Sequence, residues 1–195
     1  MTDAGSQDEK DRRDRALARL TETIPYNRFI GVNFVRMGDD LTARLNYSWK
    51  LIGNPLIPAL HGGVTGAFLE ITAITQLAWD EVWSRLEAGG AGAEEVDAGR
   101  FPKMPKTIDF TIDYLRSGRA RDAYARAVVQ KAGRRVAYVR VEAWQESRAR
   151  PIAAAHGHFL MPDGGDAGGA AGGGAAGGAG SAAAGSGGTA SGGGG

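Results

Sequence analysis

The last 33 residues of the chain limit its fold more than any other feature, because they cannot form a hydrophobic core. Residues 163–195 contain only Gly, Ala, Ser, Thr and two Asp, and Gly fills 17 of these 33 positions. Such a segment buries too little apolar surface to offset the entropy lost on ordering it. We therefore predict a disordered Gly/Ala-rich tail at 163–195 and a folded body within residues 1–162.

The body has the size and composition of one globular domain. It holds 23 Lys and Arg against 20 Asp and Glu, since two of the 22 acidic residues lie in the tail. This small excess of positive charge is spread along the chain, so we expect no nucleic-acid partner. The chain has no Cys, which excludes disulfides, thiolate metal sites and Cys nucleophiles. We expect neither a metal nor a cofactor.

The sequence predicts neither a signal peptide nor a membrane span. The first twenty residues are charged where a signal peptide needs an apolar segment. The uncharged stretch 51–69 contains two Pro and four Gly, which would break a spanning helix. We expect a cytoplasmic protein with no membrane partner.

The apolar pattern divides the body into a helix, two strands, a long helix and four strands. Leu17 and Leu20 lie at helical spacing in a charged N-terminal segment, 1–23, and predict a short helix there. Two strands are expected at 31–36 and 41–47, around a turn at Gly38, Asp39 and Asp40. A Pro- and Gly-containing loop then leads into a long helix from about 64 to 86.

A loop at 88–105, rich in Gly, Ala and Glu, is expected to be a mobile insertion. Beyond it, Ile108, Phe110, Ile112 and Tyr114 alternate with polar residues, which is typical of a half-buried strand. Three further strands are expected at about 122–131, 134–145 and 152–161. Their short connections predict an antiparallel meander of four strands, and the fold class is α+β.

One carboxylate stands out in the expected long helix. Glu70 is the only formally charged residue between Leu51 and Trp79, and its neighbours at helical spacing are small or apolar. A carboxylate on such a face is partly desolvated, which makes it a candidate catalytic group. The alternative is an ion pair with an arginine from another element, such as Arg44 or Arg140.

Gly62 and Gly63 precede the same helix. The N-terminus of a helix offers unpaired N–H groups, and a glycine lets a carbonyl group approach them. Such donors can stabilise an oxyanion; the alternative is that the pair only turns the loop into the helix. Gly63 and Glu70 share a helix face but lie roughly 10 Å apart along its axis. A site that uses both therefore needs two subunits with antiparallel helices.

The run NPLIPALHGGVTGAFLE, followed by TIDFTIDYLRSG and AGRRVAYVRVEAWQ, resembles the hotdog-fold thioesterases of the PaaI and 4-hydroxybenzoyl-CoA thioesterase type. The similarity spans residues 24–162, which would form the hotdog thioesterase domain. It implies an antiparallel β-sheet wrapped around a long central helix, with acyl-CoA bound at the subunit interface of a homodimer or homotetramer.

The resemblance also implies roles for single residues. Glu70 matches the catalytic acid, as nucleophile or as general base, and Gly63 matches the amide donor, with Gly62 as the alternative. Asn54 matches an upstream Asn or Gln that places the water or the carbonyl group. His61 matches the motif histidine, which we interpret as orienting the loop by hydrogen bonds or as simply structural. In this family a hydroxyl group often lies near the acid on the helix, and Thr72 and Thr75 are the candidates for it.

For the CoA part of the substrate, the resemblance indicates two basic segments. They are Arg116, Ser117, Gly118 and Arg119 at a strand end, and Arg134 and Arg135 at a hairpin. Arginine suits phosphate because its guanidinium donates two parallel hydrogen bonds; solvated surface is the alternative. Trp79 and Trp83 are expected in core or interface packing, or else in an acyl tunnel.

The leading hypothesis is thus an acyl-CoA thioesterase that releases a free acid and CoA from an acyl- or aryl-CoA. One alternative is an enoyl-CoA hydratase or hydroxyacyl dehydratase, which needs a histidine beside the acid. The chain offers only His61, His156 and His158. A second alternative is a non-catalytic acyl-CoA-binding protein.

Overall fold

The computed structural model describes residues 3–37 and 40–162. The expected tail at 163–195, and Gly38 and Asp39 of the expected turn, lie outside these residues. None of the helices in the described part is long and apolar enough to cross a membrane.

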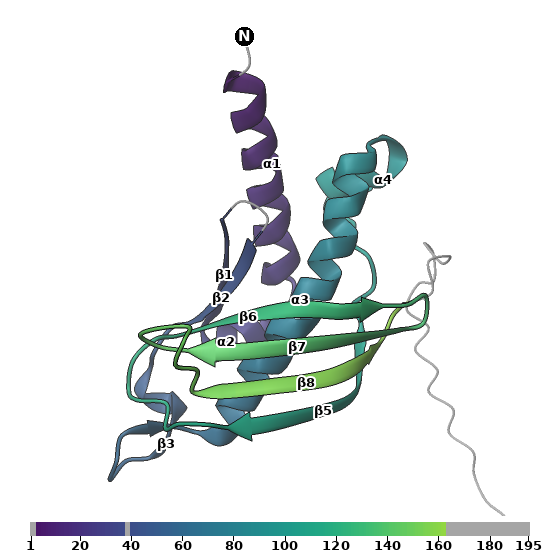
Figure 1. Cartoon of the computed structure of the whole chain (residues 1–195). Coiled ribbons are helices and arrows are strands. Elements are labelled where there is room, and N and C mark those ends of the chain that lie inside the picture. Colours follow the sequence, from purple (N-terminus) through teal and green to yellow (C-terminus); the bar gives the residue numbers. More distant parts are fainter. Residues whose placement is uncertain (1–2, 38–39, 163–195) are drawn as a thin grey trace, which may run out of the picture. The chain divides into compact units, whose positions relative to one another are not determined.

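A six-stranded antiparallel sheet forms one layer of the body (Figure 1). Its strand order is β1-β2-β6-β7-β8-β5. The bounds are Val32–Met37 for β1, Asp40–Leu45 for β2, Lys106–Tyr114 for β5, Ala123–Ala132 for β6, Val136–Trp144 for β7 and Ala153–Leu160 for β8. A small two-stranded sheet, β3 (Ile52–Asn54) with β4 (Ala59–Leu60), follows the short 3-10 helix η1 (Trp49–Leu51).

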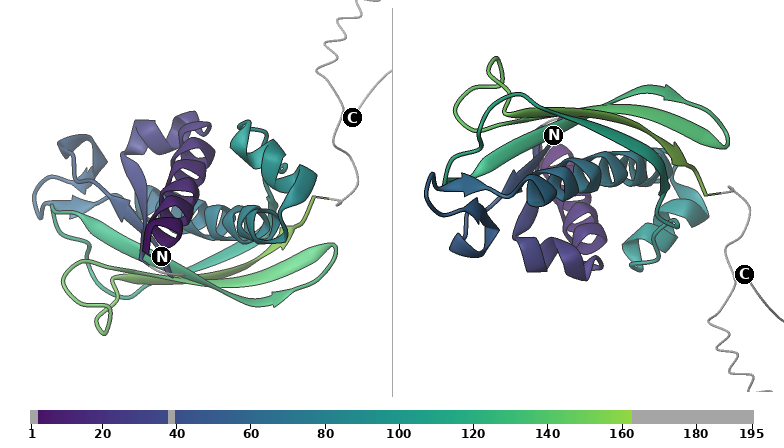
Figure 2. Two further views of the ribbon diagram at one scale, coloured as in Figure 1. Left: turned by 90° about the horizontal axis from the view of Figure 1, so that it is seen from above. Right: turned by 90° about the horizontal axis from the view of Figure 1, so that it is seen from below.

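Four helices lie on one face of the large sheet (Figure 2). They are α1 (Asp3–Glu22), α2 (Pro25–Ile30), α3 (Gly62–Ala88) and α4 (Gly90–Asp97). Helix α3 runs along this face and contacts β2, β5, β6, β7 and β8. The expected arrangement, a sheet wrapped around one long helix, is therefore present.

Small side chains on the inner face of the sheet let α3 pack closely. Along β6, β7 and β8 the buried positions alternate with more exposed ones, as expected for a sheet with one solvated face. The buried residues of these three strands include Ala123, Ala125, Ala137, Val139, Val141, Ala143, Ala153, Ala155 and Phe159. Phe68, Leu69 and Leu77 of α3 fill the space above them.

A second cluster covers the C-terminal half of α3. Leu17 and Leu20 of α1 pack there with Trp79 and Val82, and Ala93 of α4 joins them. Trp79 and Trp83 meet edge to face at 5.9 Å between ring centroids. The guanidinium carbon of Arg13 lies 3.9 Å from the centre of the Trp83 ring. Trp79 thus packs in the core, one of the roles expected for the two tryptophans, and the half-buried Trp83 packs against the same cluster.

The loop expected at 88–105 contains a helix, which corrects the prediction for its Gly-rich half. Helix α4 forms there because Ala93 and Val96 are buried against α3 and α1. Helix α2 was also missed by the strand and helix pattern. It begins with Pro25, and Gly31 ends it in the left-handed conformation at φ 81°, a typical helix stop.

The expected four-strand meander is wrong for its first strand. Strands β6, β7 and β8 follow one another across the sheet, but β5 pairs with β8 at the far edge and not with β6. Residues 115–122 carry the chain past the ends of β8 and β7 before β6 begins. Short connections do not require neighbouring strands to pair, because a loop of this length can cross one end of a sheet.

Candidate active site

Helix α3 begins at Gly62, two residues before the expected start at about 64, so both glycines lie in its first turn. His61 is its N-cap residue, and its Nδ1 accepts a hydrogen bond from the N–H of Gly63 at 3.0 Å. The N–H of Thr65 donates to the carbonyl of His61. Within residues 3–37 and 40–162, the N–H of Gly62 has no hydrogen-bond partner. Gly62, the alternative donor, is thus the better-placed glycine of the two.

The carboxylate of Glu70 lies half-buried on α3, two turns further along. Its Oε1 accepts a hydrogen bond of 2.6 Å from the hydroxyl of Thr107, on β5. No ion pair to Glu70 is found among the described residues, and Arg44 binds Asp122 instead, at 2.6 Å. The proposed alternative of a Glu70–arginine pair is therefore wrong, and Oε2 is left for another partner.

A bulge in β5 turns Thr107 toward Glu70. Thr107 pairs with Phe159 of β8 and Asp109 with His158, so Ile108 is an extra residue on β5. The bulge reverses the alternation at this end of the strand. Ile108 is 55% exposed, although the period-two pattern predicted it on the buried face, with Thr107 opposite. No signal in the sequence identifies this bulge.

The hydroxyl candidates on the helix itself do not reach the acid. The hydroxyl of Thr72 donates to the carbonyl of Phe68 at 2.7 Å. Thr75 is buried, and its hydroxyl has no partner within the described part of the chain. Thr107, which lies 37 positions from Glu70 in the sequence, supplies the hydroxyl beside the acid.

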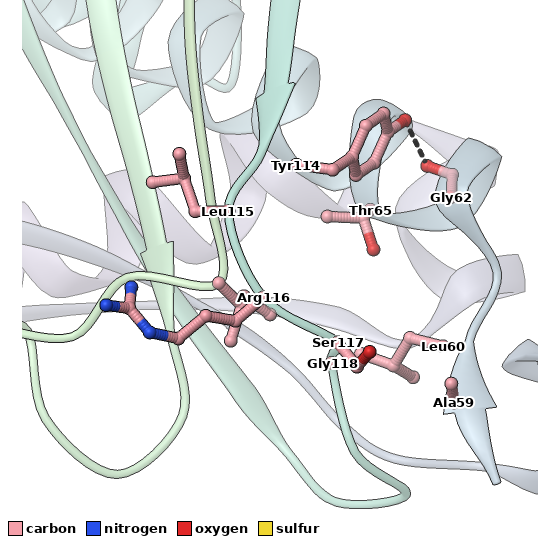
Figure 3. Close-up of a pocket in the computed structure, with 10 residues that line it drawn as sticks. Ala59, Leu60, Gly62, Thr65, Tyr114, Leu115, Arg116, Ser117 and Gly118 are labelled. Carbon is pink, nitrogen blue, oxygen red and sulfur yellow. Dashed lines mark hydrogen bonds between the residues drawn. The ribbon is translucent and has the colours of Figure 1, made fainter. Parts of the chain in front are cut away.

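A pocket of about 400 Å³ opens at the start of α3 (Figure 3). Gly62 and Thr65 line it together with residues 114–118 from the end of β5 and the following loop. The hydroxyl of Tyr114 donates to the carbonyl of Gly62 at 2.8 Å and fixes the helix start against β5. The pocket thus joins the helix N-terminus to Arg116, Ser117 and Gly118, three of the residues expected to bind CoA.

The other expected residues lie apart from this pocket. Asn54 is exposed, and its Oδ1 accepts the N–H of Leu56 within the β3–β4 turn. Arg119 follows the pocket residues along the same loop. Arg134 and Arg135 lie between β6 and β7, whereas Arg116 follows β5. The turn between β6 and β7 and the end of β5 lie at opposite ends of the sheet (Figure 1). A single chain therefore does not bring the two basic segments together.

The remaining histidines are not near the acid. His158 Nδ1 lies 2.9 Å from Asp109 Oδ2, on the outer face of the β5–β8 pair. His156 lies on the same strand and packs at 6.1 Å from the ring of Tyr138. No histidine of the described residues contacts Glu70 in the same chain.

Comparison with known proteins gives matches of three kinds: a family model, a curated relative and solved structures. A family model described as the thioesterase superfamily matches residues 58–152. The medium/long-chain acyl-CoA thioesterase YigI of Escherichia coli strain K12 is 32% identical over 127 residues, which are 64% of this chain and 78% of YigI. A solved protein from Chromobacterium violaceum is 33% identical with a TM-score of 0.55, over 80% of this chain and 97% of that one.

The E. coli PaaI protein from the phenylacetic acid degradation operon shares the fold alone. Its TM-score is 0.60 at 14% identity, over 79% of this chain and 96% of PaaI. The expected hotdog fold and the expected class of thioester hydrolase are confirmed by these matches. The family-model match, residues 58–152, runs from the segment before α3 to the residue before β8 and includes Glu70. The chain belongs to the thioesterase superfamily.

Proposed function

We propose that the protein is an acyl-CoA thioesterase whose site combines Glu70 with the N–H of Gly62. The main support for this proposal is the carboxylate of Glu70. It is half-buried, has no cationic partner among the described residues and accepts a hydrogen bond from Thr107 through one oxygen. The name of YigI, a medium/long-chain acyl-CoA thioesterase, makes medium- and long-chain acyl-CoA the first substrates to test, with aryl-CoA beside them.

In this mechanism the thioester carbonyl accepts a hydrogen bond from the N–H of Gly62 at the positive end of α3. The negative charge that develops on the carbonyl oxygen during attack is stabilised there. Oε2 of Glu70 takes a proton from the water as its oxygen bonds to the carbonyl carbon. The C–S bond then breaks, and Glu70 returns this proton to the leaving sulfur, so that the free acid and the CoA thiol are released. The alternative route has Glu70 itself attack the carbonyl carbon, and water then hydrolyses the resulting anhydride.

The two groups come from different subunits in this proposal. Gly62 and Glu70 are eight positions apart on one helix, which is about 12 Å along its axis, so one thioester cannot reach both. β5 is an edge strand of the sheet and carries Thr107, the partner of Glu70. A second copy that adds to this edge brings its own α3 start toward Glu70. The active form is therefore a homodimer, or a homotetramer built from such dimers.

The first test is Glu70→Gln, which keeps the shape of the side chain and removes the base. Loss of a general base lowers the rate by about 10²–10⁴-fold, so hydrolysis of a panel of acyl-CoA esters should fall by this factor while the circular dichroism and melting temperature stay unchanged. Hydrolysis at the wild-type rate across the whole panel would exclude Glu70 as the catalytic acid.

The oxyanion donor can be tested by removing a single N–H group. Gly62 is the first residue of α3, a position where proline is well tolerated and its backbone nitrogen carries no hydrogen. Gly62→Pro should lower kcat by about 10²–10³-fold, whereas Gly62→Ala, which keeps the N–H, should retain most activity. The added Cβ of alanine lies 3.4 Å from the Tyr114 hydroxyl, close to ordinary contact.

Mixing these two inactive variants tests the shared site. A dimer of one Glu70→Gln chain and one Gly62→Pro chain keeps one intact pair, Gly62 of the first chain with Glu70 of the second. Co-refolding equal amounts should therefore restore about a quarter of the wild-type activity, since half of the dimers are mixed and each has one working site of two. If each chain holds its own complete site, the mixture stays inactive.

The alternatives remain testable with the same protein. Neither His156 nor His158 lies beside Glu70, which disfavours a hydratase. A hydratase assay measures this activity directly, because addition of water to an enoyl-CoA lowers its ultraviolet absorbance. Tight binding of acyl-CoA without turnover would instead favour a binding protein.

A further inference from the structure

A second pocket adjoins the pocket at the start of α3. This second pocket has a volume of about 310 Å³ and lies between the loop after β5 and the loop 145–151 after β7. Arg116, Ser117 and Ile152 line both pockets. The two pockets therefore lie side by side, with the second beyond the first as seen from Gly62.

The second pocket is basic. Arg116, Arg119 and Arg150 line it together with one carboxylate, Glu146. Glu146 forms an ion pair with Arg121, and a guanidinium nitrogen of Arg119 lies 4.0 Å from the same carboxylate oxygen. The guanidinium of Arg150 makes no hydrogen bond or ion pair within residues 3–37 and 40–162. The lining thus has an excess of two positive charges and one arginine without a partner.

Hydrogen bonds hold both loops in place around this pocket. The side chain of Gln145 accepts the N–H of Arg119 at 2.9 Å and donates to the carbonyls of Arg119 and Arg121. In the other loop, the N–H of Arg150 donates to the carbonyl of Ser147 at 3.0 Å. The arginines are therefore presented from an ordered frame, which lowers the entropy lost on binding an anion.

We infer that the second pocket binds the phosphate groups of the CoA nucleotide, with Arg150 as a specificity-determining residue. This rests on the proposed function. The order of groups along an acyl-CoA is thioester, uncharged pantetheine arm, then phosphates. The order along the protein is the α3 N-terminus, a pocket with mixed polar and apolar lining, then the basic pocket. Guanidinium groups bind phosphate oxygens through paired, charge-assisted hydrogen bonds.

The inference separates the two basic segments that the sequence indicates. Arg116 and Arg119 belong to the second pocket, and the loop 145–151 adds Arg150, which was not expected. Arg134 and Arg135 lie at the other end of β7 from this loop. They are not part of this phosphate site within one chain.

Two variants that should change KM in opposite directions test the inference. Steady-state kinetics are measured with decanoyl-CoA and with decanoyl-pantetheine, which lacks every phosphate. Arg150→Gln should raise KM for decanoyl-CoA by about tenfold, the effect of one charge-assisted hydrogen bond, with kcat unchanged. Glu146→Gln, which removes the opposing charge, should lower that KM. Neither change should alter KM for decanoyl-pantetheine.

Two outcomes would overturn the inference. One is an equal KM for the two substrates in the wild-type protein. The other is an equal effect of Arg150→Gln on both, since the arginine would then not act through phosphate. Calorimetry with adenosine 3′,5′-bisphosphate gives a readout that does not depend on turnover. Should the protein hydrolyse neither ester, weaker binding of this nucleotide to Arg150→Gln would still support the phosphate site, and the proposed function alone would fail.

Discussion

The hydroxyl of Thr107 donates a 2.6 Å hydrogen bond to Oε1 of Glu70 and so ties the start of β5 to the middle of α3. The bond orients the carboxylate and leaves its second oxygen for a proton transfer. It depends on the bulge at Ile108, which turns Thr107 inward. The residue beside the acid is thus set by an irregularity of the strand.

Thr107→Val should lower kcat by roughly tenfold or more. Valine keeps the shape of threonine but removes the hydroxyl, and a hydrogen bond to a charged group contributes about 1.5–3 kcal/mol. Because Thr107 positions Glu70 and does not touch the substrate in the proposed mechanism, KM should change little. Thr107→Ser should restore the rate. Steady-state kinetics on the three proteins decides this, and a valine variant as active as the wild type would contradict it.

His61→Ala should lower the free energy of unfolding by about 1 kcal/mol, the usual cost of losing an N-cap. The side chain of His61 accepts the N–H of Gly63 at 3.0 Å, and alanine leaves that donor unpaired. Asparagine can cap a helix in the same way, so His61→Asn should recover most of the loss. Urea denaturation measures both variants. A loss of turnover in His61→Asn with unchanged stability would instead make His61 a catalytic residue.

Asp122→Asn should destabilise the protein at neutral pH but not in acid. The N–H of Tyr47 and the guanidinium of Arg44 bind this carboxylate and hold the pKa of Asp122 below its ordinary value. A lowered pKa in the folded state contributes stability above the unfolded value of about 3.9, and this is lost as the pH falls through the folded value. The stabilities of the two proteins should begin to approach each other below about pH 4 and become equal once the pH is below the folded-state pKa of Asp122. Asp113→Asn, at an exposed position of β5, is the matched control.

Gly157→Ala should prevent β5 from pairing with β8. An added Cβ would lie 2.3 Å from the backbone oxygen of Asp109 and 2.7 Å from the Phe110 ring. Overpacking against backbone costs about 1–3 kcal/mol or more, so the melting temperature should fall sharply. Gly92→Ala is the control, because its Cβ meets only the side chain of Arg85 at 3.5 Å. Within α4 that change should raise stability by about 0.5–1 kcal/mol.

The sequence alone predicts the parts of this fold that have a regular pattern. The long helix around Glu70 and the alternation of β7 follow from their apolar spacing, and the HGG run carries the family resemblance. The position of β5 at the sheet edge does not follow, because local spacing says nothing about which strands pair. Helix α4 is hidden by a Gly- and Ala-rich composition, and its stability comes from the burial of Ala93 and Val96.

The sequence predicts only part of the candidate site. Glu70 and the paired glycines are recognisable from their surroundings in the sequence. The choice between Gly62 and Gly63 depends on which N–H the His61 side chain occupies, which is a matter of side-chain geometry. Thr107 and Arg150 are brought to their positions by contacts between distant segments.

The pairing of β5 with β8 has a consequence for synthesis on the ribosome. β5 is made before β6 and β7, yet β8, the one strand that pairs with it among the described residues, ends at Leu160. A growing chain therefore carries an unpaired strand until nearly all of residues 1–162 have emerged. Contacts between such distant positions form slowly and leave the intermediate open to aggregation. A nascent chain that stalls before residue 153 would lack the whole partner strand. The sheet can therefore be completed only after β8, its last eight residues, has been synthesised.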